Sequence, residues 1–214
     1  MDDLFIEKMR DSEMNEVAAI LTDAFKTNPA YSILFQKKNQ LEDGLRWLFK
    51  TNLFIINRKQ PLTSVVKEKN TGKITGTYTL IPPQGTRKTF STYSKIGLPG
   101  FILKFGINPL VRMLGLDNYN KKLLTESMKN SAYYYMSMVV IRKEYRGTGV
   151  GTYAIKHAIR EHIASNPTCN LIGLTTQLPE NVIFYSRLGF DKLDEGRANF
   201  KGDEYYNCNM KLVL

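Results

Sequence analysis

The sequence predicts a mixed α/β fold in one domain, for three reasons. Its 214 residues, 43% of them hydrophobic, are enough to bury a sizeable core, and this length is typical of one domain. Segments with the helical spacing of apolar residues alternate with short runs of β-branched and aromatic residues. Internal repeats and low-complexity stretches are missing from the sequence. We therefore expect residues 1–214 to form a single compact unit.

The chain begins with one expected strand and two expected helices. The strand covers residues 4–10, and the first helix follows at residues 11–25 with Asp11 or Ser12 near its N-cap. The apolar face of that helix consists of Val17, Ile20, Leu21 and Phe25. A second helical stretch is expected at residues 40–57. Its apolar side chains include Leu45, Trp47, Leu48 and Phe54.

The apolar period then changes from helical to alternating. Residues 62–69 and 73–82 predict the two strands of a β-hairpin, because the short segment Asn70, Thr71, Gly72 between them is a typical turn. Residues 84–130 are broken up by proline and glycine, and 96–116 is apolar with only Lys104 and Arg112 as charges. We favour short helices packed on the sheet or a lid over a cleft, and keep a membrane-surface helix as the alternative.

The last third of the chain predicts strands and helices in alternation. Residues 132–141 are expected to be a central strand covered on both faces, because the run is continuously apolar and aromatic. Helices are expected at 151–165 and 179–188, on either side of a buried strand at 170–177. Two closing strands follow, at residues 189–193 and 204–214.

Charge and cysteine content limit the function classes. The net charge of +10 favours anionic partners, but no run of five basic residues occurs, so nucleic acid is a disfavoured partner. The apolar runs fall short of the roughly 18 uncharged residues of a membrane helix. The acidic start of the chain does not resemble a signal peptide. Cys169 and Cys208 are expected to be free thiols in the cytoplasm, and no metal site is predicted.

Three glycines, Gly147, Gly149 and Gly151, occupy the junction between the strand at 132–141 and the helix at 151–165. Unpaired backbone N–H groups at a helix N-terminus bind phosphate, and glycine allows close approach, so the cluster predicts a phosphate cradle. A tight turn that merely needs positive φ is the structural alternative. No lysine follows Gly151 as a Walker A loop requires, and a dinucleotide loop would need glycine where Thr152 stands. Nucleotides and dinucleotides are therefore disfavoured ligands.

The segment R-G-T-G-V-G at residues 146–151 resembles the acetyl-CoA pyrophosphate loop, R-x-x-G-x-G, of the GNAT superfamily of N-acetyltransferases. The segment ENVIFYSRLGF at residues 180–190 is similar to a second block of that family, with Asn181, Tyr185, Gly189 and Phe190 in place. Two motifs about thirty residues apart and in the family's order are more specific than either one. The first 80 residues agree with the family in pattern alone, and 84–130 is longer than in minimal members, so the acceptor side is not carried over.

The resemblance implies a GNAT-like fold, with a mostly antiparallel central sheet flanked by helices and strands that splay apart around 133–141 and 170–177. The splay would leave backbone groups of Val139, Val140 and Ile141 unpaired, and the pantetheine arm would pair with that edge as an added strand. The predicted pyrophosphate-binding residues are Arg146, Gly147, Thr148, Gly149, Val150 and Gly151. Asn181 completes the predicted cofactor-binding set.

The resemblance also implies the chemistry. Tyr185 matches the tyrosine that protonates the leaving thiolate, and a phenol pKa of about 10 against about 8.5 for a thiol would make that proton transfer nearly balanced. A core aromatic is the structural alternative for Tyr185. A backbone N–H near Val140 is the expected oxyanion donor. No base is named, because His157 and His162 are expected to be surface or packing residues.

The sequence therefore predicts a cytoplasmic, acetyl-CoA-dependent N-acetyltransferase. It would transfer the acetyl group directly to a primary amine, because neither cysteine has a nucleophile setting. The block at residues 181–190 is most similar to family members that modify small amines, so the resemblance implies a small molecule rather than a protein as acceptor. The alternative from another class is a GNAT-like module without catalysis that senses CoA or binds nucleic acid. The acceptor, the base and the oligomeric state are left open by the sequence.

Overall fold

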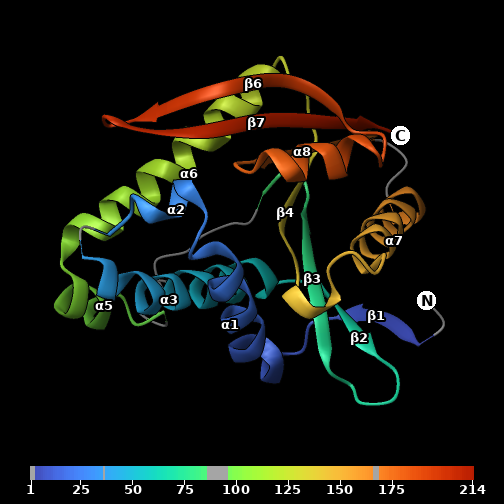
Figure 1. Cartoon of the computed structure of the whole chain (residues 1–214), viewed down its shortest axis with the longest axis horizontal. Helices are drawn as coiled ribbons and strands as arrows, with labels where there is room; N and C mark the ends of the chain where they lie inside the picture. Colours follow the sequence, from blue (N-terminus) through green and yellow to red (C-terminus); the bar gives the residue numbers. More distant parts are fainter. Residues whose placement is uncertain (1–2, 36, 86–95, 166–168) are drawn as a thin grey trace.

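The computed structural model describes residues 3–35, 37–85, 96–165 and 169–214, and within them it contains one seven-stranded sheet (Figure 1). The strands, in chain order, are β1 Leu4–Lys8, β2 Thr63–Glu68, β3 Ile74–Ile81, β4 Tyr134–Ile141, β5 Leu171–Thr176, β6 Asp191–Phe200 and β7 Asp203–Val213. The α-helices are α1 Met14–Phe25, α2 Pro29–Ser32, α3 Lys38–Asn57, α5 Leu98–Phe105, α6 Ile107–Ser127, α7 Val150–Ser165 and α8 Pro179–Ser186. Two short 3₁₀ turns, η1 Asp11–Glu13 and η2 Lys143–Tyr145, complete the set. The predicted mixed α/β class is confirmed.

The strand order in the sheet is β1-β2-β3-β4-β5-β7-β6. Neighbouring strands are antiparallel except for β4 and β5, which run parallel. These two strands pair only at Tyr134 with Ile172 and at Tyr135 with Gly173, so they separate from there to their carboxyl ends. The predicted splay is therefore confirmed, and it lies in the middle of the sheet.

A β-bulge interrupts β4 close to this separation. Thr77 of β3 pairs with Val140, but Thr79 pairs with Ser137, so the single β3 residue between them faces two residues of β4. Met138 takes up the extra residue with a φ of +50°, a left-handed conformation that non-glycine residues rarely adopt. Because of the extra residue, Met136 and Met138, two positions apart on β4, point to opposite faces of the sheet. Met136 packs on the side of α7 and α8, whereas Met138 packs on the side of α1 and α3.

Two hydrophobic clusters cover opposite faces of the sheet. Side chains of α1, α3, α5 and α6 form one cluster with residues such as Val65 and Val140, and those of α7 and α8 form the other with residues such as Val66 and Ile172. Figure 1 shows α1 and α3 on one side of β3 and β4, and α7 on the other. Val65 and Val66 are successive residues of β2 and point to opposite faces, as the pleat of a strand requires.

The segment 84–130 contains α5 and α6, and its residues 86–95 lie outside the described part of the chain. Phe101 of α5 and Met113 and Leu116 of α6 are buried against the cluster that covers α3. Helices therefore occur in this segment as expected, but only α5, with 8 residues, is short, whereas α6 has 21 residues. None of the helices in the described ranges is both long and apolar enough to span a membrane.

Three details differ from the sequence prediction. Neither Asp11 nor Ser12 is the N-cap: Arg10 occupies that position before η1, and its backbone N–H donates to the Glu13 carboxylate at 2.9 Å. Strand β6 runs to Phe200, well past the predicted end at residue 193, because polar residues of that segment pair with β7 throughout. Strand β4 is central, but its residues alternate between buried and half-buried.

Candidate functional site

A cavity of about 780 Å³ opens where β4 and β5 separate. The cavity is lined by residues of both strands, by the segment between η2 and α7, and by α8. On its other side it is closed by residues of α1, α2, α3 and α6. One face of β4 therefore borders empty space rather than packed side chains, which explains why this central strand is only partly buried.

The glycine-rich junction forms one wall of this cavity. Gly147 and Gly149 have φ values of +78° and +89°, which side chains other than glycine rarely tolerate. The Gly149 carbonyl accepts the N–H of Tyr153 at 3.0 Å, so helix α7 starts directly after this residue. The first N–H groups of α7 have no acceptor within a helix and carry its positive dipole end. The cradle therefore offers backbone donors and positive potential to an anion.

Arg146 and Thr148 also hold the loop in shape. The Nε of Arg146 donates to the carbonyl of Ile141 at 3.1 Å, and the Thr148 hydroxyl donates to the carbonyl of Tyr145 at 2.7 Å. The expectation that the backbone groups of Ile141 are unpaired is thus wrong for its carbonyl, because the guanidinium of Arg146 reaches back to it. The remaining guanidinium nitrogens of Arg146 are at the exposed rim of the cavity.

The structure brings most of the predicted cofactor-binding residues to one place. The residues of this set that line the cavity are Val139, Val140, Ile141, Arg146, Gly147, Gly149, Gly151 and Asn181. Thr148 and Val150 do not line it: Thr148 is exposed and bonded within the loop, and Val150 is buried in the cluster below α7. Asn181 donates from Nδ2 to the Thr176 hydroxyl at 3.2 Å, which ties α8 to the end of β5.

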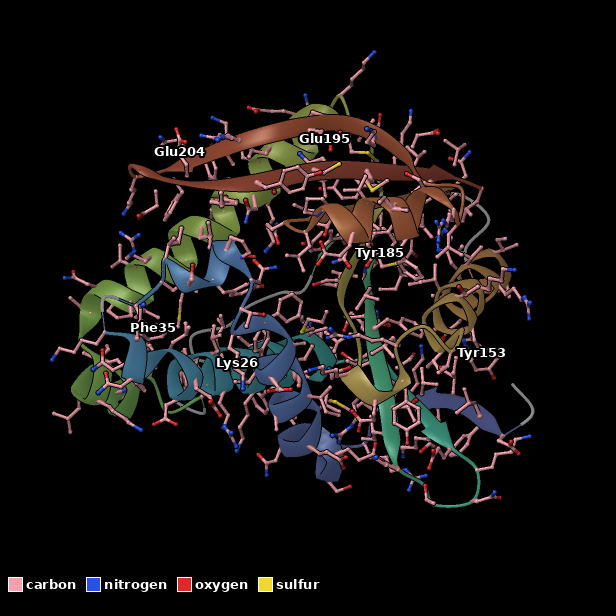
Figure 2. All side chains as sticks on the ribbon, in the orientation of Figure 1. Lys26, Phe35, Tyr153, Tyr185, Glu195 and Glu204 are labelled. Atoms are coloured by element: carbon pink, nitrogen blue, oxygen red, sulfur yellow. The ribbon has the colours of Figure 1, made fainter. Side chains whose placement is uncertain are left out.

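Tyr185, the predicted acid, lines the same cavity from α8. Figure 2 shows Tyr185 on α8, between the β6–β7 hairpin and the strands β3 and β4. Its ring lies edge-on to Phe184 and Phe190, with centroids 5.1 and 5.6 Å away. Burial raises the pKa of the Tyr185 phenol above its ordinary value. The expected near balance between phenol and thiol pKa values is therefore wrong: this phenol is a neutral donor and a weaker acid than assumed.

The two histidines lie outside the lining of the cavity. Nδ1 of His157 is 2.9 Å from the hydroxyl of Tyr78, and Nε2 of His162 is 2.6 Å from the carbonyl of Cys169. Both side chains come from α7, which covers the sheet face opposite α1 and α3. Cys169 and Cys208 are free thiols and do not line the cavity either.

Several polar residues of the cavity were missed by the sequence analysis. The carboxylates of Asp117 on α6 and Glu180 on α8 belong to its lining. A chain of buried amides runs past its centre: Asn28 donates to Gln177 at 3.3 Å, and Gln177 donates to Asn207 at 3.2 Å. Asn28 was detectable as a helix cap, because it precedes Pro29, and its Oδ1 accepts the N–H of Ala30. Asp117 could not be identified from the sequence, because the sequence does not show which face of its helix borders the cavity.

Groups of three or more residues that could together bind a metal ion do not occur among the described residues. The donors of the cavity are instead backbone N–H groups, amides, hydroxyls, phenols, the Trp47 indole, the Lys121 ammonium and the Arg146 guanidinium. Such a set is suited to an anionic, amide-bearing ligand that enters between β4 and β5.

The sequence of the middle of the chain matches a known family. Residues 117–192 match the family model described as an acetyltransferase (GNAT) domain. The matched segment contains β4, the glycine-rich junction, α7, β5 and α8. No curated protein sequence matches the chain significantly.

Solved structures match nearly the whole chain in fold. A protein described as histone acetyltransferase HPA2 and related acetyltransferase, from Corynebacterium glutamicum, has 18% identity and a TM-score of 0.61, with 97% of this chain and 95% of that chain covered. A candidate arylalkylamine N-acetyltransferase from the yellow fever mosquito has 11% identity and a TM-score of 0.63, with 98% and 87% covered. A candidate acetyltransferase from Salmonella typhimurium, solved with acetyl-CoA, has 14% identity and a TM-score of 0.55, with 99% and 94% covered. At these identities the likeness concerns the fold.

Proposed function

We propose that the chain is an N-acetyltransferase, and that it transfers the acetyl group of acetyl-CoA directly to a primary amine of a small molecule; its residues 117–192 match the acetyltransferase (GNAT) domain model. One observation carries this proposal. Strands β4 and β5 share only two pairs before they separate, and the cavity at that point is lined by both the glycine cradle and Tyr185. A cosubstrate with a pyrophosphate and an amide-bearing arm would find the glycine cradle for its pyrophosphate and the unpaired edge of β4 for its amides.

The residues of the cavity fit CoA in two ways. A cradle with φ values of +78° and +89° at Gly147 and Gly149 turns backbone N–H groups toward an anion, as a pyrophosphate requires. The edge of β4 that β5 leaves unpaired at Val139 and Val140 suits the two amides of a pantetheine arm, which would bind as an added strand. A neighbour in fold was solved with acetyl-CoA, which supports the same assignment.

Bound acetyl-CoA would supply the acetyl group as a reactive thioester. In the proposed reaction the amine nitrogen forms a bond to the acetyl carbon, the carbon–sulfur bond breaks, and the nitrogen gives up a proton to water. A backbone N–H at Val139 or Val140, beside the bulge, would donate to the oxygen that becomes negative. Tyr185 would donate its hydroxyl proton toward the departing sulfur, and its raised pKa keeps that hydroxyl protonated.

Direct transfer is favoured over a covalent enzyme intermediate, because neither Cys169 nor Cys208 lines the cavity. A small acceptor is favoured over a protein, because helices α2, α3 and α6 close the acceptor side.

We further propose that residues 1–214 act as one domain, with 84–130 as a helical insertion on that side. Free thiols agree with the reducing cytoplasm as the site of action.

Calorimetric titration with CoA tests the cosubstrate assignment without any acceptor. We expect saturable heat with one site per chain, and a loss of affinity when Arg146 is replaced by Ala, because the guanidinium at the rim faces the anion. Absence of binding heat for CoA would refute the assignment.

A further inference from the structure

The acceptor end of the cavity has walls of aromatic and aliphatic side chains. Phe25 and Tyr31 belong to this lining with their ring centroids 5.1 Å apart, and Trp47, Met113 and Tyr135 line the same cavity. Burial keeps the phenols of Tyr31 and Tyr135 neutral by raising the pKa of each. Rings and neutral phenol oxygens are favourable neighbours for a cation, whereas an anion has few partners among them.

Asp117 is the acidic residue of this end. Of the two carboxylates in the described lining, Glu180 lies on α8 beside the predicted cofactor residue Asn181, and Asp117 lies on α6. Asp117 shares the lining of the cavity with Tyr31 and Tyr135. A cation that enters along the phenols therefore moves toward a negative charge.

Lys121 is the present partner of this carboxylate. Its Nζ lies 2.6 Å from Oδ2 of Asp117, one helical turn away, and both side chains are 49% exposed. Half-exposed pairs at this spacing contribute little to stability, so a ligand cation can replace the lysine at small cost. Both Asp117 and Lys121 line the cavity, so a ligand there can reach the carboxylate that now pairs with the ammonium.

We propose that Asp117 selects the acceptor: its carboxylate exchanges Lys121 for the ammonium group of an arriving amine whose body is apolar, such as an arylalkylamine, and disfavours amines that carry a carboxylate. The inference rests on the proposed acetyl transfer for its biological meaning, but it concerns amine binding alone. Asp117 is a specificity-determining residue in this scheme and takes no part in bond formation. Exchange at the half-exposed mouth affects capture of the amine rather than the later chemical step.

Tryptophan fluorescence can report the binding of the amine. Trp47 is the single tryptophan of the sequence and lines the acceptor end, where its indole N–H donates to the carbonyl of Ile96 at 3.0 Å. Its fluorescence can therefore be titrated with 2-phenylethylamine in the presence of CoA. The titration reads binding whether or not acetyl transfer occurs.

Two variants of the pair give opposite expectations. In Asp117→Asn the dissociation constant of 2-phenylethylamine should rise about tenfold, because the attracting charge is lost. In Lys121→Met it should fall by about threefold, because the competing ammonium is gone. Glu126→Gln removes the neighbouring pair of the same helix, Lys122 with Glu126 at 3.8 Å, which does not line the cavity, and should leave the constant unchanged.

Phenylalanine is the matched ligand, because it differs from 2-phenylethylamine by one carboxylate. It should bind the natural chain at least about tenfold more weakly. The inference is overturned if both variants shift the constant in the same direction, if neither shifts it, or if no fluorescence change occurs with the amine. If the expected pattern is found but no amine is acetylated, the proposed reaction fails while the amine site stands.

Discussion

Gly151 lies directly beneath the ring of Phe184. A methyl group built on Gly151 would be 3.2 Å from Cζ of Phe184 and 3.6 Å from Cγ1 of Ile141. All three residues line the cavity, so this is the point where the ends of α7, α8 and β4 approach one another. Its φ is not in the left-handed region, unlike those of Gly147 and Gly149. Close packing against Phe184, and not backbone conformation, is therefore what favours glycine at this position.

Replacing Gly151 by Ala should weaken CoA binding by about fivefold while the free energy of unfolding stays nearly constant. Alanine favours the helix by about 1 kcal/mol over glycine, which offsets the tight contact with Phe184, but the added methyl group still narrows the cradle. Calorimetry with CoA and urea denaturation measure the two effects. Gly196→Ala is the control, since its methyl group meets nothing within 4 Å. Equal CoA affinity in both variants would contradict this role for Gly151.

Replacing Gly149 by Ala should instead reduce the stability of the fold. A φ of +89° strains any residue with a Cβ by about 1–3 kcal/mol, or the loop must change its shape. We expect a melting temperature lower by several degrees than that of Gly151→Ala, measured by circular dichroism. A variant as stable as the natural chain would show that the loop does not hold this conformation in solution.

Replacing Tyr185 by Phe should lower kcat by about tenfold to a hundredfold and leave the affinity for CoA within twofold, because the ring packing against Phe184 and Phe190 is kept. Steady-state kinetics and calorimetry separate the two quantities. Tyr153→Phe is the matched control, because Tyr153 lies on α7 and does not line the cavity (Figure 2). Full activity of Tyr185→Phe would contradict the proposed role of Tyr185 as the proton donor.

The pH dependence of kcat gives a second test of Tyr185. Burial raises the pKa of its phenol above the ordinary value of about 10, so the hydroxyl remains protonated throughout the neutral and mildly alkaline range. We expect no loss of kcat from this group up to about pH 10. An alkaline decline centred below that pH, present in the natural chain and absent from Tyr185→Phe, would contradict the raised pKa.

Lys67 provides a prediction about stability. Its ammonium is 6% exposed on β2 and pairs with the carboxylates of Glu7 and Glu13. Replacing it by Met should cost about 1–3 kcal/mol at pH 7, because two partly buried carboxylates lose their partner. Lys73→Met, which breaks an exposed pair with Glu144, is the control and should lower the stability much less than Lys67→Met does.

The cost of Lys67→Met should depend on pH in a defined direction. The hydrogen bond from Lys67 lowers the pKa of Glu7 below its ordinary value of 4.5. A carboxyl group whose pKa is lowered in the folded state stabilises the fold above the unfolded pKa, and this contribution is lost as the pH falls through the folded pKa. The stability difference between the natural chain and the variant should thus be constant above about pH 5 and shrink below it. A difference that is independent of pH would contradict the assigned pair.

Part of the proposed cofactor site could be predicted from the sequence, because backbone conformation constrains the residue type. Gly147 and Gly149 stand where φ is positive, and Tyr185 lies in a motif of fixed spacing. The bulge at Met138 left no such trace, since methionine is not a residue that positive φ selects. The bond from Arg146 to the Ile141 carbonyl depends on a side-chain direction that spacing does not specify.

The acceptor side was not predictable for a different reason. Tyr31, Trp47 and Asp117 come from three helices that are far apart in the chain and meet only in the folded structure. The apolar periodicity of α3 indicated a buried face, but it could not separate residues that fill the core from residues that border a cavity. Strand β6 was cut short in the prediction because its exposed face is polar, although its pairing with β7 continues to Phe200.

The most direct test of the proposed acetyl transfer is the release of free CoA thiol from acetyl-CoA over a panel of primary amines, with the acetylated amine measured by mass spectrometry in the same samples. We predict thiol release that requires an amine, with one acetylated amine formed for each thiol, and rates about tenfold to a hundredfold lower in Tyr185→Phe. Thiol release that is the same with and without every amine, or its absence throughout, would contradict the proposed function.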